Sequence, residues 1–248
     1  AADFVRLQDV HGFAVLETWI DGTCVARDSA SLLPKSRSRR ANRFFEQEIT
    51  PSDFQVSAGI GDIRIIEAWD GQIITGAGQA EPLIKNGFAV ADPSRDILKI
   101  AVINRYRAAP PAIAFVRGIG LKTGAIASSV AHDCHNIVAV GTTDEALTRA
   151  VNMIIRKAGG IAVAGRNASG RILPLPVAGL MSDGYAEDVA EGYADLTREA
   201  RELGSPLQAP FMTLSFLALL VIPALKLSDK GLFDGVKFEF TPAFVGLP

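Results

Sequence analysis

The stretch that decides the fold runs from Ala125 to Thr142 and reads Ala-Ile-Ala-Ser-Ser-Val-Ala-His-Asp-Cys-His-Asn-Ile-Val-Ala-Val-Gly-Thr. Its two apolar runs, residues 125–130 and 136–140, have the length and composition of buried strands. The polar segment His132–Asn136 lies at their junction. Burying such polar side chains costs free energy unless they bond to one another or to a ligand. The segment is therefore either a satisfied internal network, which composition alone favours, or a binding site.

Strand geometry leaves two arrangements of these side chains open. If the chain stays extended from Ser128 to Cys134, His132 and Cys134 point to one face and Asp133 and His135 to the other. If the chain turns after His132, the two imidazoles can converge and Asp133 can orient one of them by accepting its N–H. A polar segment between two strands favours the turn.

The rest of the chain has the pattern of a mixed α+β fold. Asp21-Gly22 and Asp70-Gly71 are typical hairpin turns. Further strands are expected at residues 3–10, 14–26, 62–69, 97–103, 112–116, 161–164, 171–176 and 236–241. The last of these alternates clearly between apolar and polar residues.

Two helices are indicated by their periodicity. Thr142 and Glu145 form a capping box ahead of an apolar face, and Gly159 ends this first helix. The second helix is expected from about Ala186 to Leu203, with Ser182 or Asp183 as a candidate cap at its entry.

Composition bounds the class of protein. With 248 residues and a net charge of −2, the chain can bury a sizeable core and gives no electrostatic reason to bind nucleic acid or an anionic membrane. Cys24 and Cys134 show no disulfide or zinc spacing, which favours free thiols in the cytoplasm. We expect no signal peptide at Ala1, and the longest apolar run, residues 214–225, is shorter than the ~20 residues of a membrane span.

A basic segment separates the first strands from the rest. Residues 35–43 carry five positive charges in nine positions. A phosphate or partner contact is one interpretation. A solvated linker is favoured, because no aromatic residues interleave with the charges.

Five short motifs occur in a fixed order. They are Gly118-Ile-Gly-Leu-Lys-Thr-Gly-Ala-Ile-Ala-Ser-Ser-Val-Ala-His-Asp-Cys-His-Asn136, Gly141-Thr-Thr-Asp-Glu145, Leu175-Pro-Val-Ala-Gly-Leu-Met-Ser-Asp183, Pro210-Phe-Met-Thr-Leu-Ser-Phe-Leu-Ala-Leu219 and Leu225-Lys-Leu-Ser-Asp-Lys-Gly-Leu-Phe233. Over about Ile97 to Val245 the chain thereby resembles the C-terminal region of bacterial adenine deaminases, members of the amidohydrolase superfamily. One departure is Cys134, where the family usually has a serine, and this changes the hydrogen bonding at that position.

The resemblance implies a domain organisation. The family has a (β/α)₈ barrel that holds two divalent metal ions, manganese or iron, through a His-x-His pair, further histidines and acidic residues. This chain has three histidines and no His-x-His, so we expect the barrel and its metal ligands to lie outside it. Residues 1–30 are expected to be the returning strands of a small β-sandwich whose partner strands precede Ala1. Residues 31–44 would be the basic linker, and 45–248 the C-terminal α+β domain.

The resemblance also implies an activity, the hydrolysis of adenine to hypoxanthine and ammonia by a metal-activated water. This chain alone is expected to be inactive, to contain no catalytic residue or metal ligand, and to line or close the purine pocket. The candidate substrate-binding residues are His132, Asp133, His135, Asn136, Ser128 and Ser129. Expected partners are adenine, the protein's own upstream barrel and further copies in a homo-oligomer. The alternative is a free-standing purine-binding or regulatory module without catalysis.

Overall fold

The computed structural model describes residues 2–34, 40–45, 47–167 and 169–246. Contacts group the chain into two units, Ala1–Ser38 and Arg39–Pro248. The domain boundaries expected at residues 30 and 44 stay predictions. Of the expected basic linker, residues 35–39 lie outside the described residues.

The first unit is a four-stranded antiparallel sheet in the order β1-β2-β3-β4. Its strands are β1 (Phe4–Leu7), β2 (Val15–Ile20), β3 (Thr23–Arg27) and β4 (Ala30–Ser31). Asp21 and Gly22 both have positive φ, 50° and 73°, between the paired residues Ile20 and Thr23. The predicted two-residue hairpin turn is therefore confirmed.

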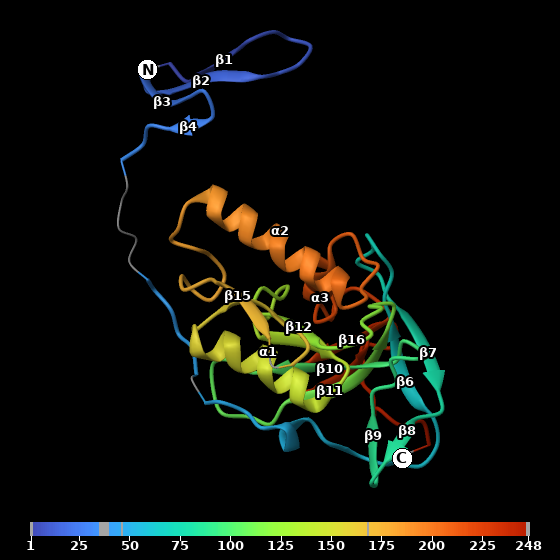
Figure 1. The fold of residues 1–248 in the computed structure, drawn as a ribbon. Helices are drawn as coiled ribbons and strands as arrows, with labels where there is room; N and C mark the ends of the chain where they lie inside the picture. The colour runs from blue at the N-terminus through green and yellow to red at the C-terminus, as the bar shows by residue number, and fades with distance from the viewer. Residues whose placement is uncertain (1, 35–39, 46, 168, 247–248) are drawn as a thin grey trace. The chain divides into compact units, whose positions relative to one another are not determined.

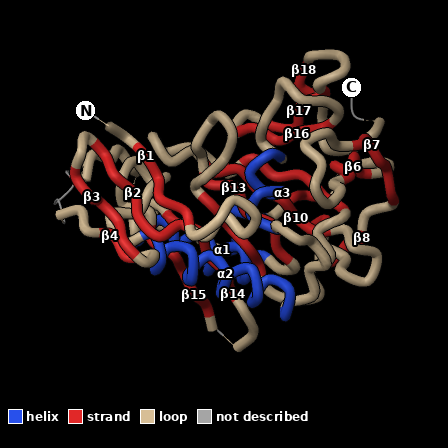
Figure 2. Tube along the Cα trace, turned by 90° about the horizontal axis from the view of Figure 1, so that it is seen from above, coloured by secondary structure: helices blue, strands red, loops and turns tan. Residues whose placement is uncertain are grey.

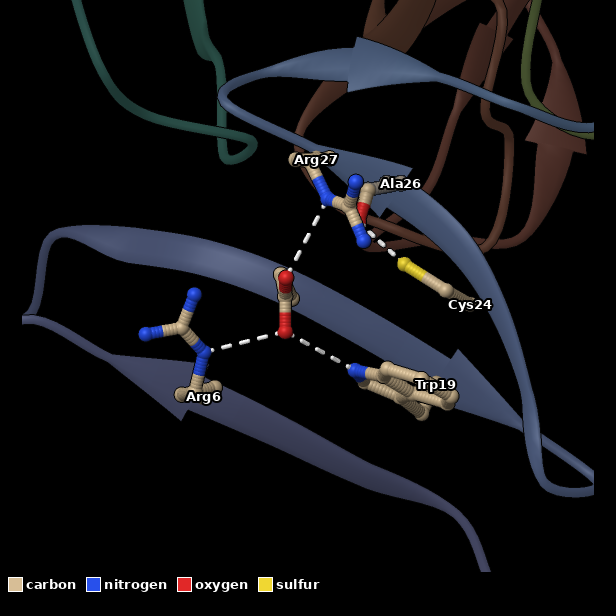
Figure 3. A network of polar contacts seen from close by, with 6 residues as sticks. Arg6, Trp19, Cys24, Ala26 and Arg27 are labelled. Atoms are coloured by element: carbon tan, nitrogen blue, oxygen red, sulfur yellow. Dashed lines mark hydrogen bonds and ion pairs between the residues drawn. The ribbon is translucent and has the colours of Figure 1, made fainter.

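Glu17 collects the polar contacts on one face of this sheet. The Glu17 carboxylate accepts hydrogen bonds from Arg6 Nε at 2.9 Å, Arg27 Nε at 3.1 Å and Trp19 Nε1 at 3.2 Å (Figure 3). Hydrogen bonds from Arg6 and Trp19 and the two positive charges lower the pKa of Glu17 to about 2. None of residues 2–34 is buried, so little hydrophobic stabilisation comes from within this unit.

The second unit is built on an eight-stranded mixed sheet in the order β15-β14-β12-β13-β10-β11-β6-β7. Its strands are β6 (Ile63–Glu67), β7 (Gly76–Ala80), β10 (Leu98–Ile103), β11 (Ala112–Arg117), β12 (Ala125–Ser128), β13 (Ile137–Gly141), β14 (Gly160–Ala164) and β15 (Gly170–Pro174). Only β11 and β6 are parallel among the neighbouring pairs. The described residues contain no (β/α)₈ barrel, and the predicted α+β class is confirmed.

Helices cover both faces of this sheet (Figure 1). On one face, α1 (Asp144–Arg156) buries Leu147, Val151 and Ile154 against β12, β13 and β14. On the other face, α2 (Ala186–Glu202) and α3 (Pro210–Phe216) enclose the largest apolar cluster. The central strand β10 is buried at every position, as a strand covered on both faces must be.

Two small sheets complete the unit, and Figure 2 shows β16–β18 close to the β6 and β7 end. They are β16 (Leu225–Ser228), β17 (Gly231–Asp234) and β18 (Glu239–Phe240), and β5 (Val56–Ser57), β9 (Phe88–Val90) and β8 (Leu83–Lys85), with a short 3₁₀ helix at Pro51–Phe54. The strand predicted at 236–241 is mostly wrong. The Asp234 carboxylate accepts the backbone N–H groups of Val236 and Lys237, which turns the chain and leaves Phe238 with a φ of 60°.

The predicted helices need one correction at a cap. The helix expected near 186–203 is confirmed as α2, but its N-cap is Tyr185, whose side chain makes no capping hydrogen bond, and not Ser182 or Asp183. Helix α1 is capped by Thr143, whose hydroxyl accepts the Ala146 N–H at 3.1 Å. The predicted capping box of Thr142 and Glu145 is wrong, because Thr142 donates instead to the carbonyl of Gly124.

The Asp70-Gly71 prediction is right in kind but not in length. Strands β6 and β7 pair in antiparallel fashion up to Glu67 and Gly76, so the hairpin connection spans residues 68–75 and contains both turn residues. Within the described ranges, no helix is long and apolar enough to cross a membrane.

Candidate functional site

The chain turns at the polar segment between β12 and β13. Residues 132–134 form the turn, and it is closed by the His135 N–H, which donates to the Ala131 carbonyl at 2.8 Å. His135 has a φ of 51°. Of the two arrangements open from the sequence, the structure has the turn. We call residues 131–136 the polar loop.

Helix α3 fixes the His132 side chain. The imidazole stacks on the Phe216 ring, with centroids 4.5 Å apart and planes 18° from parallel. Its Nδ1 lies 3.3 Å from the Ser215 hydroxyl, and the His132 backbone N–H donates to the Ser215 carbonyl at 3.1 Å. Asp133 is exposed, and the group hydrogen-bonded to the His132 ring is the hydroxyl of Ser215.

Arg105 supports the other end of the polar loop. This side chain is only 4% exposed, and its Nε donates to the His135 carbonyl. Its Nη2 donates to the Tyr106 hydroxyl at 3.1 Å and its Nη1 to Asn42 Oδ1 at 3.5 Å. The buried Asn136 accepts the Arg105 backbone N–H at 3.4 Å. His132 and His135 are thus anchored to different elements.

An acidic residue, Asp229, lies near Cys134 of the polar loop. Asp229, in the turn between β16 and β17, accepts a hydrogen bond from Asn104 Nδ2 at 2.7 Å. Burial raises the pKa of the Cys134 thiol, and the negative charges of Asp229 and Asp133 add to the rise. Cys134 is therefore a protonated, partly buried thiol that packs against the main apolar cluster.

The two candidate serines are both buried and both bonded to backbone. The Ser128 hydroxyl accepts the Val130 N–H at 3.0 Å. The Ser129 hydroxyl donates to the Gly179 carbonyl at 2.6 Å and accepts the Gly160 N–H at 2.9 Å. The bonds of Ser129 hold the chain just before the polar loop to β14 and to the segment after β15.

A cleft of about 270 Å³ opens beside the anchor of His132. It is formed by residues 70–73 and by residues 208–216 of α3 and the segment before it, with Phe216 in its wall. Lys226 lies behind it and is fully buried, with Nζ donating to the carbonyls of Ile73 at 2.7 Å and Phe216 at 3.0 Å. Desolvation lowers the pKa of Lys226 to about 8.

Sequence reasoning missed several residues around the loop. Ser215, Phe216 and Asp229 lie in two of the five motifs, residues 210–219 and 225–233, so the sequence indicates their segments but not the residues themselves. Asn104 and Arg105 directly follow β10 and carried no signal of their own. The described residues include no group of three or more His, Cys, Asp or Glu that could hold a metal ion.

Comparisons with known proteins show which family this chain is similar to. The model of the adenine deaminase C-terminal domain matches residues 72–239. The adenine deaminase of Salinibacter ruber is 52% identical over 98% of this chain and 45% of its own length. That of Methanosarcina barkeri is 48% identical over 99% and 46%, and that of Parabacteroides distasonis 42% identical over 99% and 45%.

The fold and these matches together define the class of protein. The second unit is an α+β domain, and its described residues contain no (β/α)₈ barrel. The chain belongs to the adenine deaminase C-terminal domain family. It spans about half the length of the curated relatives it matches.

Proposed function

We propose that this chain is the C-terminal part of an adenine deaminase, which hydrolyses adenine to hypoxanthine and ammonia in purine metabolism. In this proposal the polar loop lines or closes the purine pocket. The observation that carries it is the meeting of motifs at the loop: His132 contacts Ser215 and Phe216, Cys134 lies near Asp229, and Ser129 binds Gly179.

The loop has the properties of a pocket wall that is positioned in advance. Its backbone is held from two directions, by Arg105 at His135 and by α3 at His132, while the His132 side chain is only partly covered. A binding site needs such support, because side chains held by packing and hydrogen bonds lose little entropy when a ligand binds. His132 and Asn136 are the proposed contacts to the purine.

The chemical step in this proposal needs groups from outside this chain. A divalent metal ion, manganese or iron, would supply the activated water. In this proposal the metal ligands belong to the upstream barrel. The part of this chain is to bind and orient the purine and to exclude water. Cytoplasmic location and a homo-oligomeric state belong to the same proposal.

The first test is the intact mass of the polypeptide as its native host makes it. A mass more than twice 26.3 kDa would support an upstream barrel. A mass near that value would favour the alternative, a free-standing purine-binding or regulatory module. The second test incubates the intact protein with adenine and measures ammonia and hypoxanthine, and the absence of both would reject the proposal.

The site itself is tested by His132→Asn in the intact protein. Loss of one hydrogen bond to the purine should lower kcat/KM for adenine by about tenfold. His11→Asn is the matched control, because His11 is exposed in the first unit. Unchanged turnover and an unchanged Michaelis constant in His132→Asn would remove the polar loop from the pocket.

A further inference from the structure

The His132 ring has only one orientation open to it. Stacking on Phe216 sets the plane of the ring, and the contact of Nδ1 with Ser215 sets its rotation within that plane. Lys226 in turn holds the Phe216 carbonyl at the end of α3. Because Nδ1 faces the helix, Nε2 is the ring nitrogen left for a ligand.

The protons between His132 and α3 can be assigned by counting donors. The Ser215 hydroxyl has one proton and lies 2.8 Å from the Met212 carbonyl, which can only accept. This contact is shorter than the 3.3 Å contact with His132 Nδ1, so we assign the hydroxyl proton to it, and the hydroxyl oxygen then offers His132 a lone pair. The nitrogen facing it must then carry the imidazole proton, because two lone pairs 3.3 Å apart would repel each other.

We propose that Ser215 holds neutral His132 with its proton on Nδ1, so that Nε2 is a fixed hydrogen-bond acceptor for the amino group of a 6-aminopurine. This inference rests on the proposed function, and it names the atom and the ligand group. Ser215 is a positioning residue, and His132 is the residue that contacts the ligand.

Such an acceptor discriminates between the substrate and the product of the proposed reaction. The exocyclic nitrogen of adenine is a donor, whereas the corresponding oxygen of a 6-oxopurine is an acceptor. A fixed lone pair on Nε2 binds the first and repels the second. Sites built around one hydrogen bond reject a ligand that cannot complete it, so the arrangement favours binding of adenine and release of hypoxanthine.

The proton assignment can be measured without any ligand. The chain has three histidines, His11, His132 and His135, so ¹⁵N-histidine labelling gives three resolvable imidazoles. At pH 8, above the usual histidine pKa of about 6.5, a long-range ¹H–¹⁵N spectrum separates protonated from unprotonated ring nitrogens. We expect protonated Nδ1 and bare Nε2 in His132. A proton on Nε2 overturns the proposal.

Variants of Ser215 test its part in the arrangement. Ser215→Ala removes the hydroxyl and should give His132 a mixture of the two neutral forms, and Ser215→Thr, which keeps the hydroxyl, should restore the single form. Ser205→Ala is the matched control, because Ser205 is also buried and its hydroxyl has no partner in the described chain. If Ser215→Ala leaves the single form unchanged, Ser215 does not set it and the proposal fails.

The ligand preference is tested in the intact protein after chelation of divalent metal, so that adenine binds without turnover. Adenine should shift the His132 Nε2 signal and hypoxanthine should not. His132→Gln, whose amide reaches the position of Nε2, should keep more of the adenine preference than His132→Asn, in which we expect it to fall about two- to tenfold. Equal shifts with both purines, or no shift in a protein that deaminates adenine, overturn this inference alone. A protein that releases no ammonia from adenine rejects the proposed function instead.

Discussion

Replacing Ser129 by alanine should destabilise the second unit far more than the same change at Ser128. The two serines are adjacent and equally buried, with 0% and 1% exposure. Ser129 joins two segments, since it accepts from the Gly160 N–H and donates to the Gly179 carbonyl. Ser128 bonds only to the nearby Val130 backbone, accepting its N–H at 3.0 Å and making a longer contact of 3.4 Å with its carbonyl.

The magnitude follows from the backbone groups that lose a partner. Each buried donor or acceptor without a partner costs about 1–3 kcal/mol. Ser129→Ala leaves two such groups and should lower the free energy of unfolding by about 3 kcal/mol. Ser128→Ala removes the bond to the Val130 N–H and the longer contact with the Val130 carbonyl. Because Val130 is only partly buried, this should cost about 1 kcal/mol.

Urea denaturation of the 248-residue chain, monitored by circular dichroism, measures both free energies of unfolding. An unchanged slope m of free energy against urea concentration shows that the variants unfold in the same way as the parent chain. For a unit of this size, 3 kcal/mol corresponds to a fall in Tm of about 6–12 °C. Equal destabilisation by the two substitutions would refute the reasoning, because it would mean that the two orphaned groups find other partners.

The remaining predictions concern three further sites. Arg105→Met should lower the free energy of unfolding by about 3 kcal/mol, because the hydrogen bonds of a buried cation are lost. Arg107 is exposed, so Arg107→Met should change the free energy of unfolding by less than about 0.5 kcal/mol. Similar urea midpoints for the two variants would contradict this. The pKa of Lys226 is lowered from 10.5 to about 8, so the folded state binds the proton less tightly than the unfolded state. The free energy of unfolding, compared with that of Lys226→Met, should therefore increase as the pH is raised from about 8 to 10.5. If the difference in Tm between the two proteins is constant across this pH range, Lys226 is not a buried cation with a lowered pKa. Thr143→Ala should lower the free energy of unfolding by about 1 kcal/mol and speed amide hydrogen exchange in the first turn of α1. Thr142→Ala should leave the exchange of that turn unchanged. Faster exchange in Thr142→Ala than in Thr143→Ala would mean that Thr142 is the cap.

The sequence by itself determined the local elements. The periodicity of α2, the apolar run of β10 and the Asp21-Gly22 turn each depend on neighbouring residues, so a short window contains the whole signal. The order of the five motifs was also enough to place the chain in its family. The same local reasoning failed at 236–241, where alternation favoured a strand but the Asp234 side chain bonds the backbone into a turn.

Only the tertiary structure decided what surrounds the polar loop. His132 and Ser215 are 83 positions apart in sequence, and Asn104 and Asp229 are 125 apart, so no local pattern links them. Likewise, Thr142 and Thr143 both satisfy the composition of a cap, and the choice depends on the Gly124 carbonyl that engages Thr142. The sequence marked the polar residues that need partners, and the packing of β12, β13 and α3 determined which partners they received, because hydrogen bonds between distant segments form only where the fold brings those segments together.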